Sequence, residues 1–199
     1  MKILFLSANP KKTERLRFDK EFKEIQGSIA VSKARTKVIL QYIAAVKAKD
    51  VQGYIKKEKP DIVHFSGHGN SNGEIILEDE TRYPKVIPVE KFANMFKVLD
   101  SQIRCVVLNC CYSAITAKEI SRTIDFVIGI KKDVADGPAI AFSSGFYLAL
   151  GAKKDLKLAF DFAVSEFLLK GGLIEEKPEL FIQSGINPSQ TYFIKENEG

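Results

Sequence analysis

The sequence predicts an α/β fold in which helices cover a mostly parallel sheet of about six strands. Two observations lead to this prediction. Short apolar, β-branched segments such as 61–66 and 103–109 are typical of strands that are buried on both faces. Amphipathic segments with helical spacing lie between them, so strands and helices alternate along the chain. Such alternation implies parallel strands joined by right-handed crossovers.

Length and composition indicate one globular domain, 1–199. The 199 residues suffice for a core of useful size, and 45% hydrophobic with 28% charged residues is ordinary for a globular protein. No apolar run approaches the roughly 20 residues of a membrane span, and the amino terminus lacks the layout of a secretory signal. We therefore expect a cytoplasmic protein without a membrane partner. The net charge of +5 is spread over lysine pairs without an aromatic stacking motif, so we expect no nucleic-acid partner.

The N-terminal part predicts three strands and two helices. The strands are expected over 2–7, 36–44 and 61–66. Apolar residues at helical spacing predict an amphipathic helix that starts near Thr13 with this residue as its cap, and a second, short helix follows Asp50.

The remaining chain continues the alternation. A β-hairpin is expected around 74–79, and Pro88 leads into an amphipathic helix. Strands at 103–109 and 125–130 flank a helix for which Ser113 is the expected cap. Helices over 138–151 and 156–169 precede an edge strand near 180–183, and the polar tail 195–199 is expected to fray.

A histidine and a cysteine follow two of the predicted strands. The carboxyl ends of neighbouring parallel strands converge on one crevice, so His68 and Cys111 can meet there as a base and a thiol. Cys111 also precedes the amino terminus of a helix, which favours a thiolate. Backbone N–H groups of Gly69 and Cys111 are candidates for an oxyanion site. A structural cysteine beside an unrelated loop histidine would give the same pattern, and no acid that orients His68 is evident.

The other cysteines and the other histidine predict packing roles. Cys105, Cys110 and Cys111 all lie in one short segment, so we expect free thiols in a reducing compartment. Cys105 and Cys110 are expected to pack as small hydrophobes, and His64 as a hydrogen-bonded core histidine. With no further histidine and no cluster of calcium ligands, neither a metal nor a cofactor is predicted.

Several segments in a fixed order resemble one family. Ser66-Gly-His-Gly69 and Leu108-Asn-Cys-Cys-Tyr-Ser113 are similar to the histidine and cysteine motifs of caspase-like cysteine peptidases, and most similar to the bacterial CHAT-domain branch. The blocks 2–10, 59–69, 104–113 and 137–142 extend the resemblance over most of the chain. It implies a caspase-like three-layer α/β sandwich in which His68 is the base. Alignment of the motifs selects Cys111 over Cys110 as the nucleophile.

The sequence departs from that family at two positions. Relatives that cut after basic residues carry an acid two places before the nucleophile, where this chain has Asn109. Ala114 stands where the family favours glycine. Asp133 and Asp136 follow a predicted strand and could border the substrate cleft or be solvated loop acids. Asn109, Asp133 and Asp136 are therefore the candidate substrate-binding residues.

The resemblance implies a cysteine endopeptidase that cleaves a protein or peptide substrate. Such bacterial domains commonly serve in defence or cell-death signalling, and we expect a separate regulatory or sensor protein to control this one. The alternative is a catalytically inactive module of the same fold that serves as a binding or adaptor domain. A third reading is a nucleotide-cleaving domain with Glu74 or Glu78 as its acid, although no Gly-rich phosphate loop supports it.

Overall fold

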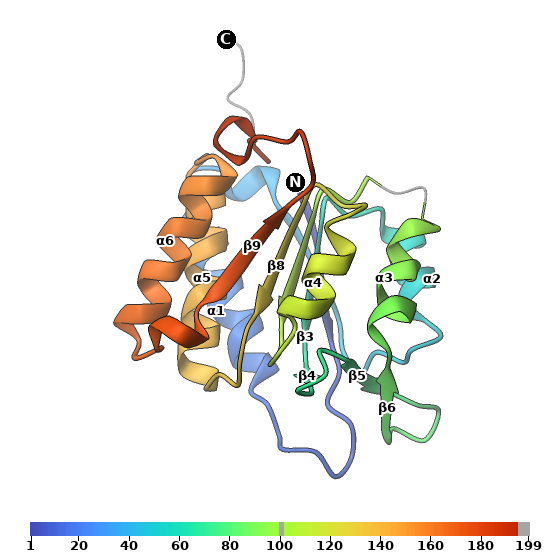
Figure 1. Cartoon of the computed structure of the whole chain (residues 1–199). Coiled ribbons are helices and arrows are strands. Elements are labelled where there is room, and N and C mark those ends of the chain that lie inside the picture. Colours follow the sequence, from blue (N-terminus) through green and yellow to red (C-terminus); the bar gives the residue numbers. More distant parts are fainter. Residues whose placement is uncertain (100–101, 195–199) are drawn as a thin grey trace.

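The computed structural model describes residues 1–99 and 102–194. It consists of a six-stranded sheet between two layers of helices, with a small second sheet beside one end (Figure 1). This arrangement confirms the predicted α/β class with a mostly parallel sheet. The strand order in the large sheet is β2-β1-β3-β7-β8-β9.

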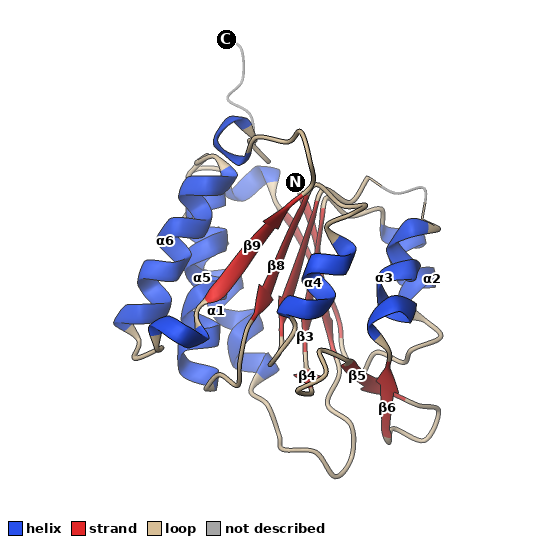
Figure 2. Cartoon of the chain, viewed as in Figure 1, coloured by secondary structure: helices blue, strands red, loops and turns tan. Residues whose placement is uncertain are grey.

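The strands of the large sheet run parallel except the last. β9 pairs antiparallel with β8 at one edge, and Figure 2 shows its arrow pointing against the others. The strands are β1 (Lys2–Ser7), β2 (Ile39–Ile43), β3 (Ile62–Ser66), β7 (Cys105–Asn109), β8 (Phe126–Ile130) and β9 (Pro178–Ile182).

Three helices cover each face of the sheet (Figure 1). On one face α5 (Asp136–Gly151) packs against both α1 (Phe18–Ala30) and α6 (Leu156–Leu169). The other face carries α2 (Val51–Glu58), α3 (Val89–Lys97) and α4 (Ala114–Ile120). Short 3-10 turns lie at Arg35–Lys37, Ile174–Glu176 and Pro188–Gln190.

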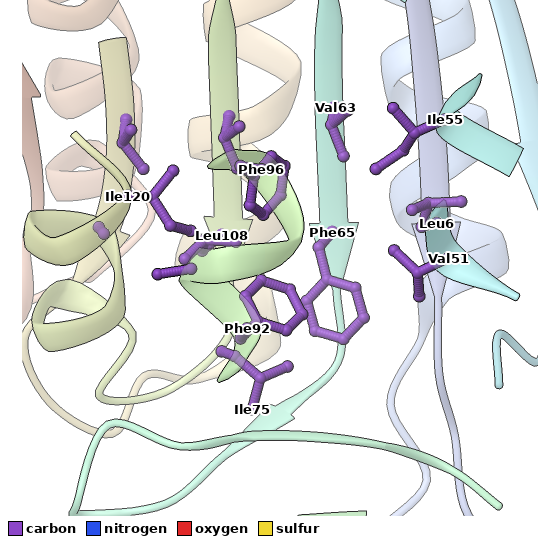
Figure 3. Packing of buried hydrophobic residues seen from close by; sticks show 14 of the residues in the cluster. Leu6, Val51, Ile55, Val63, Phe65, Ile75, Phe92, Phe96, Leu108 and Ile120 are labelled. Carbon is purple, nitrogen blue, oxygen red and sulfur yellow. The ribbon is translucent and has the colours of Figure 1, made fainter. Parts of the chain in front are cut away.

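Alternation along the strands divides the core into two clusters, one on each face. Along β3, Val63 and Phe65 belong to the cluster under α2, α3 and α4, whereas Ile62 belongs to the cluster under α1, α5 and α6. Figure 3 shows the first cluster, in which the rings of Phe65 and of Phe92 on α3 pack edge to face. The centroids of the two rings are 6.0 Å apart. Successive side chains of a strand point to opposite faces, so a strand covered on both sides is apolar throughout.

A three-stranded antiparallel sheet lies at the end of the large sheet where β3 terminates. It comprises β4 (His68–Gly69), β5 (Ile75–Glu78) and β6 (Pro84–Ile87), in that order. The segment 74–79, where a hairpin was expected, holds the single strand β5, and its hairpin partner β6 lies farther along the chain. Neither β4 nor β6 was predicted from the sequence.

Some element ends differ from their predictions. Helix α1 begins at Phe18, and the prediction that Thr13 caps it is wrong because the Thr13 hydroxyl donates to the Pro10 carbonyl inside a loop. Ser113 precedes α4 but does not cap it, because its hydroxyl bonds elsewhere. Strand β2 starts only at Ile39, after a 3-10 turn. The predicted frayed tail, 195–199, lies outside the described residues.

Candidate active site

The two predicted site segments lie side by side because β3 and β7 are neighbours. Ser66 at the end of β3 pairs with Asn109 at the end of β7. The chain then continues to His68 on one side and to Cys111 on the other, and both residues line a cavity of about 540 Å³. The convergence predicted from the strand ends is thus observed. The cavity is completed by residues from α1, its preceding loop, and the start of α5.

Gly69 brings β4 into close contact with the cysteine loop. A Cβ atom at this position would lie 2.1 Å from the carbonyl oxygen of Cys111, so only glycine fits without displacing main chain. The N–H of Asn70 donates to the carbonyl of Glu74, and Gly69 lies opposite Ile75. Hydrogen-bonded and non-bonded pairs alternate along an antiparallel ladder. The Gly69 N–H therefore points away from β5.

His68 is half-buried and lines the cavity with an unpaired nitrogen. Its Nε2 is the one buried side-chain nitrogen or oxygen in residues 1–99 and 102–194 that has no hydrogen-bond partner. Burial lowers the pKa of His68, although a hydrogen bond to the main chain of Glu14 and the charges of Glu14 and Asp136 oppose this shift. The imidazole is therefore neutral at neutral pH and can accept a proton.

Cys111 is held by the loop that follows β8. Burial and a hydrogen bond to the Asp133 carboxylate raise the pKa of the Cys111 thiol to about 12, against an opposing hydrogen bond from the Val134 main chain. The Tyr112 N–H donates to the Lys132 carbonyl at 3.2 Å, which ties the two loops together. The expected thiolate is thus wrong for this conformation, because burial and a carboxylate outweigh the short helix α4.

Ser113 fixes the main chain around the cysteine. Its buried hydroxyl hydrogen-bonds with the carbonyl oxygens of Leu108 and Cys110, at 2.9 and 2.7 Å, and accepts from the Ile130 N–H at 2.9 Å. These bonds join the ends of β7 and β8. Within the described residues, no hydrogen bond joins His68 directly to the Cys111 thiol.

Glu21 is a site residue that the sequence did not reveal. It lies on the amphipathic helix α1, where the sequence places it among several solvated acids, yet it is 3% exposed and lines the cavity. Its carboxylate accepts hydrogen bonds from His64 Nε2 at 3.0 Å and from Ser143 Oγ at 2.8 Å. His64 also bonds the Tyr147 hydroxyl at 3.0 Å, which confirms it as a satisfied core histidine.

The predicted substrate-binding residues fall in three different settings. Asn109 is nearly buried and donates from Nδ2 to Glu21 and to Ser143. Asp133 contacts the Cys111 thiol, and Asp136 lines the cavity at the start of α5. All three border the same cavity. The polar atoms of Asn109 and Asp133 already bond protein groups there.

Glu74 and Glu78 lie away from the cavity. Glu74 accepts a hydrogen bond from Asn70, and the buried Glu78 accepts from the Asn9 N–H and from Arg82. Neither is among its lining residues. This placement removes the basis for a nucleotide-cleaving acid at either position.

The other two cysteines are buried in the core. Cys105 and Cys110 are free and buried, as predicted for small hydrophobes. Within the part of the chain that the structure describes, no group of three or more acidic, cysteine or histidine side chains could hold a metal ion. None of the helices in the described ranges has the length and apolar character to cross a membrane.

Comparison with solved structures identifies the fold. A secreted C11 cysteine protease from Bacteroides thetaiotaomicron, solved with an irreversible peptide inhibitor, superposes with a TM-score of 0.59 at 12% identity over 90% of this chain and 65% of that one. Caspase-1 from Spodoptera frugiperda gives a TM-score of 0.57 at 10% identity over 90% of this chain and 84% of that one. The chain has a caspase-like fold. At such low identity the comparison establishes the fold alone.

Comparison of sequences gives one curated relative. A protein named "Probable protease" from Gillisia limnaea is 25% identical over 167 residues, which cover 82% of this chain and 30% of that protein. The chain therefore spans less than a third of that relative's length. No protein-family model matches the sequence.

Proposed function

We propose that the chain is a cysteine peptidase in which Cys111 is the nucleophile and His68 the general base. One observation supports this assignment most directly: the unpaired Nε2 of a neutral His68 borders the same cavity as the Cys111 thiol. A buried imidazole nitrogen without a hydrogen-bond partner lowers the stability of the folded protein by about 1–3 kcal/mol. Unpaired buried groups of this kind are often found at functional sites. A substrate or a rearranged thiol would supply the missing partner.

The proposed reaction transfers an acyl group to the thiol and then to water. His68 takes the Cys111 proton, and the thiolate attacks the peptide carbonyl to form the C–S bond. The N–H groups of Gly69 and Cys111 stabilise the oxyanion. The C–N bond breaks as His68 returns its proton to the leaving amine. Water, deprotonated by His68, then hydrolyses the thioester and releases the acid.

The peptide as substrate class is supported by the relatives. The C11 protease with the same fold binds a peptide inhibitor, and the sequence relative is named a protease. The three free thiols suit a reducing compartment, as expected for a cytoplasmic protein. The resemblance to CHAT domains extends the proposal to defence or cell-death signalling.

The raised pKa of the Cys111 thiol supports the proposal that a separate protein regulates this chain. Because the Cys111 thiol is hydrogen-bonded to the Asp133 carboxylate, it is a poor nucleophile. General-base catalysis requires the His68 imidazole to accept the thiol proton instead. A partner that displaces the loop carrying Asp133 would release the thiol. Under this proposal, the observed conformation is the latent one.

Covalent labelling with peptidyl acyloxymethyl ketones tests the catalytic assignment. These reagents alkylate a cysteine that is activated within a peptide-binding site, and mass spectrometry locates the modified residue. We expect modification at Cys111 and at least about a hundredfold slower reaction in His68→Ala, as for loss of a general base. Equal reaction with and without His68 would favour the alternative, a binding or adaptor module that retains the fold.

A further inference from the structure

One buried carboxylate joins four segments that are far apart in the chain. Glu21, in the first turn of α1, accepts hydrogen bonds from side chains of β3, β7 and α5. Each donor residue is at most 9% exposed. Hydrogen bonds that are buried to this degree are stronger than exposed ones, so the carboxylate fixes how these segments lie relative to one another. The donor residues are His64, Ser66, Asn109 and Ser143.

Two of these bonds hold the strand ends that lead to the proposed catalytic residues. Ser66 ends β3 and donates to the carboxylate's Oε2, and Asn109 ends β7 and donates to Oε1. His68 and Cys111 lie two residues beyond these strand ends. The main-chain bond from the Gly67 N–H to the Asn109 carbonyl is 3.5 Å long, which makes it weak. Hydrogen bonds to an ionised group are roughly twice as strong as neutral ones, so the carboxylate is the firmer link at this point.

Helix α1 also reaches His68 from the opposite direction. The main chain of Glu14, in the loop before α1, hydrogen-bonds His68. The N–H of Glu21 donates to the Arg17 carbonyl at 3.0 Å, which ties the buried carboxylate's own residue to the end of this loop. The residue that anchors α1 to the strand ends therefore also anchors the loop that contacts the imidazole. His68 is thus held from two sides by segments that Glu21 joins.

The Glu21 carboxylate acts through its neighbours. Burial opposes its ionisation, yet hydrogen bonds from His64, Ser66 and Ser143 and the charge of His64 together lower the pKa of Glu21. The group is therefore ionised at neutral pH and can only accept hydrogen bonds. All four of its donors are protein side chains, so its contacts favour a role in placing residues rather than in binding substrate.

We propose that Glu21 is a positioning residue that sets where His68 and Cys111 lie, by holding the ends of β3 and β7 and the start of α1. The proposal rests on the proposed peptidase function for its meaning in catalysis. The environment of His68 can be measured without any reaction. The positioning role and the peptidase function can therefore fail separately.

An NMR titration of the His68 imidazole tests the positioning role. The chain has two histidines, so the spectrum of His68→Ala identifies the signal of interest. In Ser66→Ala the strand end loses its bond to the carboxylate. We expect the pKa of His68 to rise by at least about half a unit, because burial, the main cause that lowers it, is relieved. The matched control is Ser143→Ala, which removes a hydroxyl that bonds the same carboxylate from α5 and should leave the titration unchanged.

A double-mutant cycle assigns the effect to Glu21. Glu21→Asp keeps the charge but shortens the side chain by one methylene, so the carboxylate draws back from Ser66 and the pKa of His68 should rise as in Ser66→Ala. If the bond between the two residues positions His68, combining both substitutions should shift the titration no further than either alone. Fully additive shifts, or an unchanged titration in Ser66→Ala, or equal shifts in Ser66→Ala and Ser143→Ala, would overturn the positioning role. If Glu21→Asp prevents folding, the comparison of the two serine variants decides.

Labelling of Cys111 connects the positioning role to the reaction. Peptidyl ketones should modify Ser66→Ala and Glu21→Asp at least about tenfold more slowly than Ser143→Ala, because a misplacement of about 1 Å can slow a reaction roughly a hundredfold. Iodoacetamide needs no aligned base and should label Cys111 at similar rates in all three variants. Equal slowing with both reagents would report a general loss of structure and contradict positioning. If His68 shifts as expected but ketones leave Cys111 of the wild type unmodified, the peptidase proposal fails alone.

Discussion

Replacing Asp133 with asparagine should activate the Cys111 thiol. With a pKa of about 12, about one thiol in ten thousand is ionised at pH 8, compared with about a quarter for an unperturbed cysteine of pKa near 8.5. Burial is the larger cause of the shift and persists in the variant, but the carboxylate that accepts the thiol proton is removed. One pKa unit corresponds to a tenfold change in thiolate at this pH, so we expect iodoacetamide to label Asp133→Asn at least about tenfold faster.

The pH profile of labelling provides the sharper readout. In the wild-type chain the rate should rise about tenfold per pH unit through pH 9, because the folded-state pKa lies above this range. In Asp133→Asn the curve should shift to lower pH. Mass spectrometry separates Cys111 from the buried Cys105 and Cys110, and Asp19→Asn is the matched control. Superimposable profiles for the variant and the wild type would refute the claim that Asp133 holds the thiol.

Three further substitutions test the architecture of the site. Gly69→Ala should slow peptidyl ketone labelling of Cys111 at least about tenfold and lower stability by about 1–3 kcal/mol, because the new methyl group would overlap the carbonyl oxygen of Cys111. The control is Gly53→Ala on α2, where a methyl group has no neighbour within 4 Å and labelling should be unchanged. Glu21→Ala should lower the free energy of unfolding in urea by about 3–5 kcal/mol, since it removes the shared acceptor of four buried hydrogen bonds. A loss below about 1 kcal/mol would show that these hydrogen bonds contribute little. Ser113→Ala should cost about 1–3 kcal/mol by leaving a buried N–H unpaired, and unchanged thermal unfolding would contradict this.

The sequence predicted the site as far as strand order determines it. His68 and Cys111 each follow an apolar strand, and the adjacency of β3 and β7 in a parallel sheet places both at one cavity. The alternation of strands and helices likewise predicted the two-layered covering of the sheet. These features depend on short-range patterns and on the handedness of crossovers, which the residues themselves specify.

Side-chain contacts between residues far apart in the chain could not be predicted from the sequence. Glu21 lies 43 residues from His64 and 122 from Ser143 along the chain, so no local pattern reveals that they meet. Among the acids of α1 it looks like a solvated residue. The prediction of an activated thiol failed for the same reason, because the partner of Cys111 is Asp133 from a separate loop. Thr13 and Ser113 were expected as caps and instead bond loop and strand carbonyls.

Proteolysis of an unfolded protein substrate tests the central claim most directly. Reduced, alkylated casein would be incubated with the wild-type chain, Asp133→Asn, and Asp133→Asn combined with Cys111→Ala or with His68→Ala, and new amino termini would be identified by mass spectrometry. We expect cleavage by Asp133→Asn that exceeds that of the wild type and disappears when Cys111 or His68 is replaced. Cleavage that survives replacement of Cys111, or none by any variant while peptidyl ketones also leave Cys111 unmodified, would contradict a cysteine peptidase.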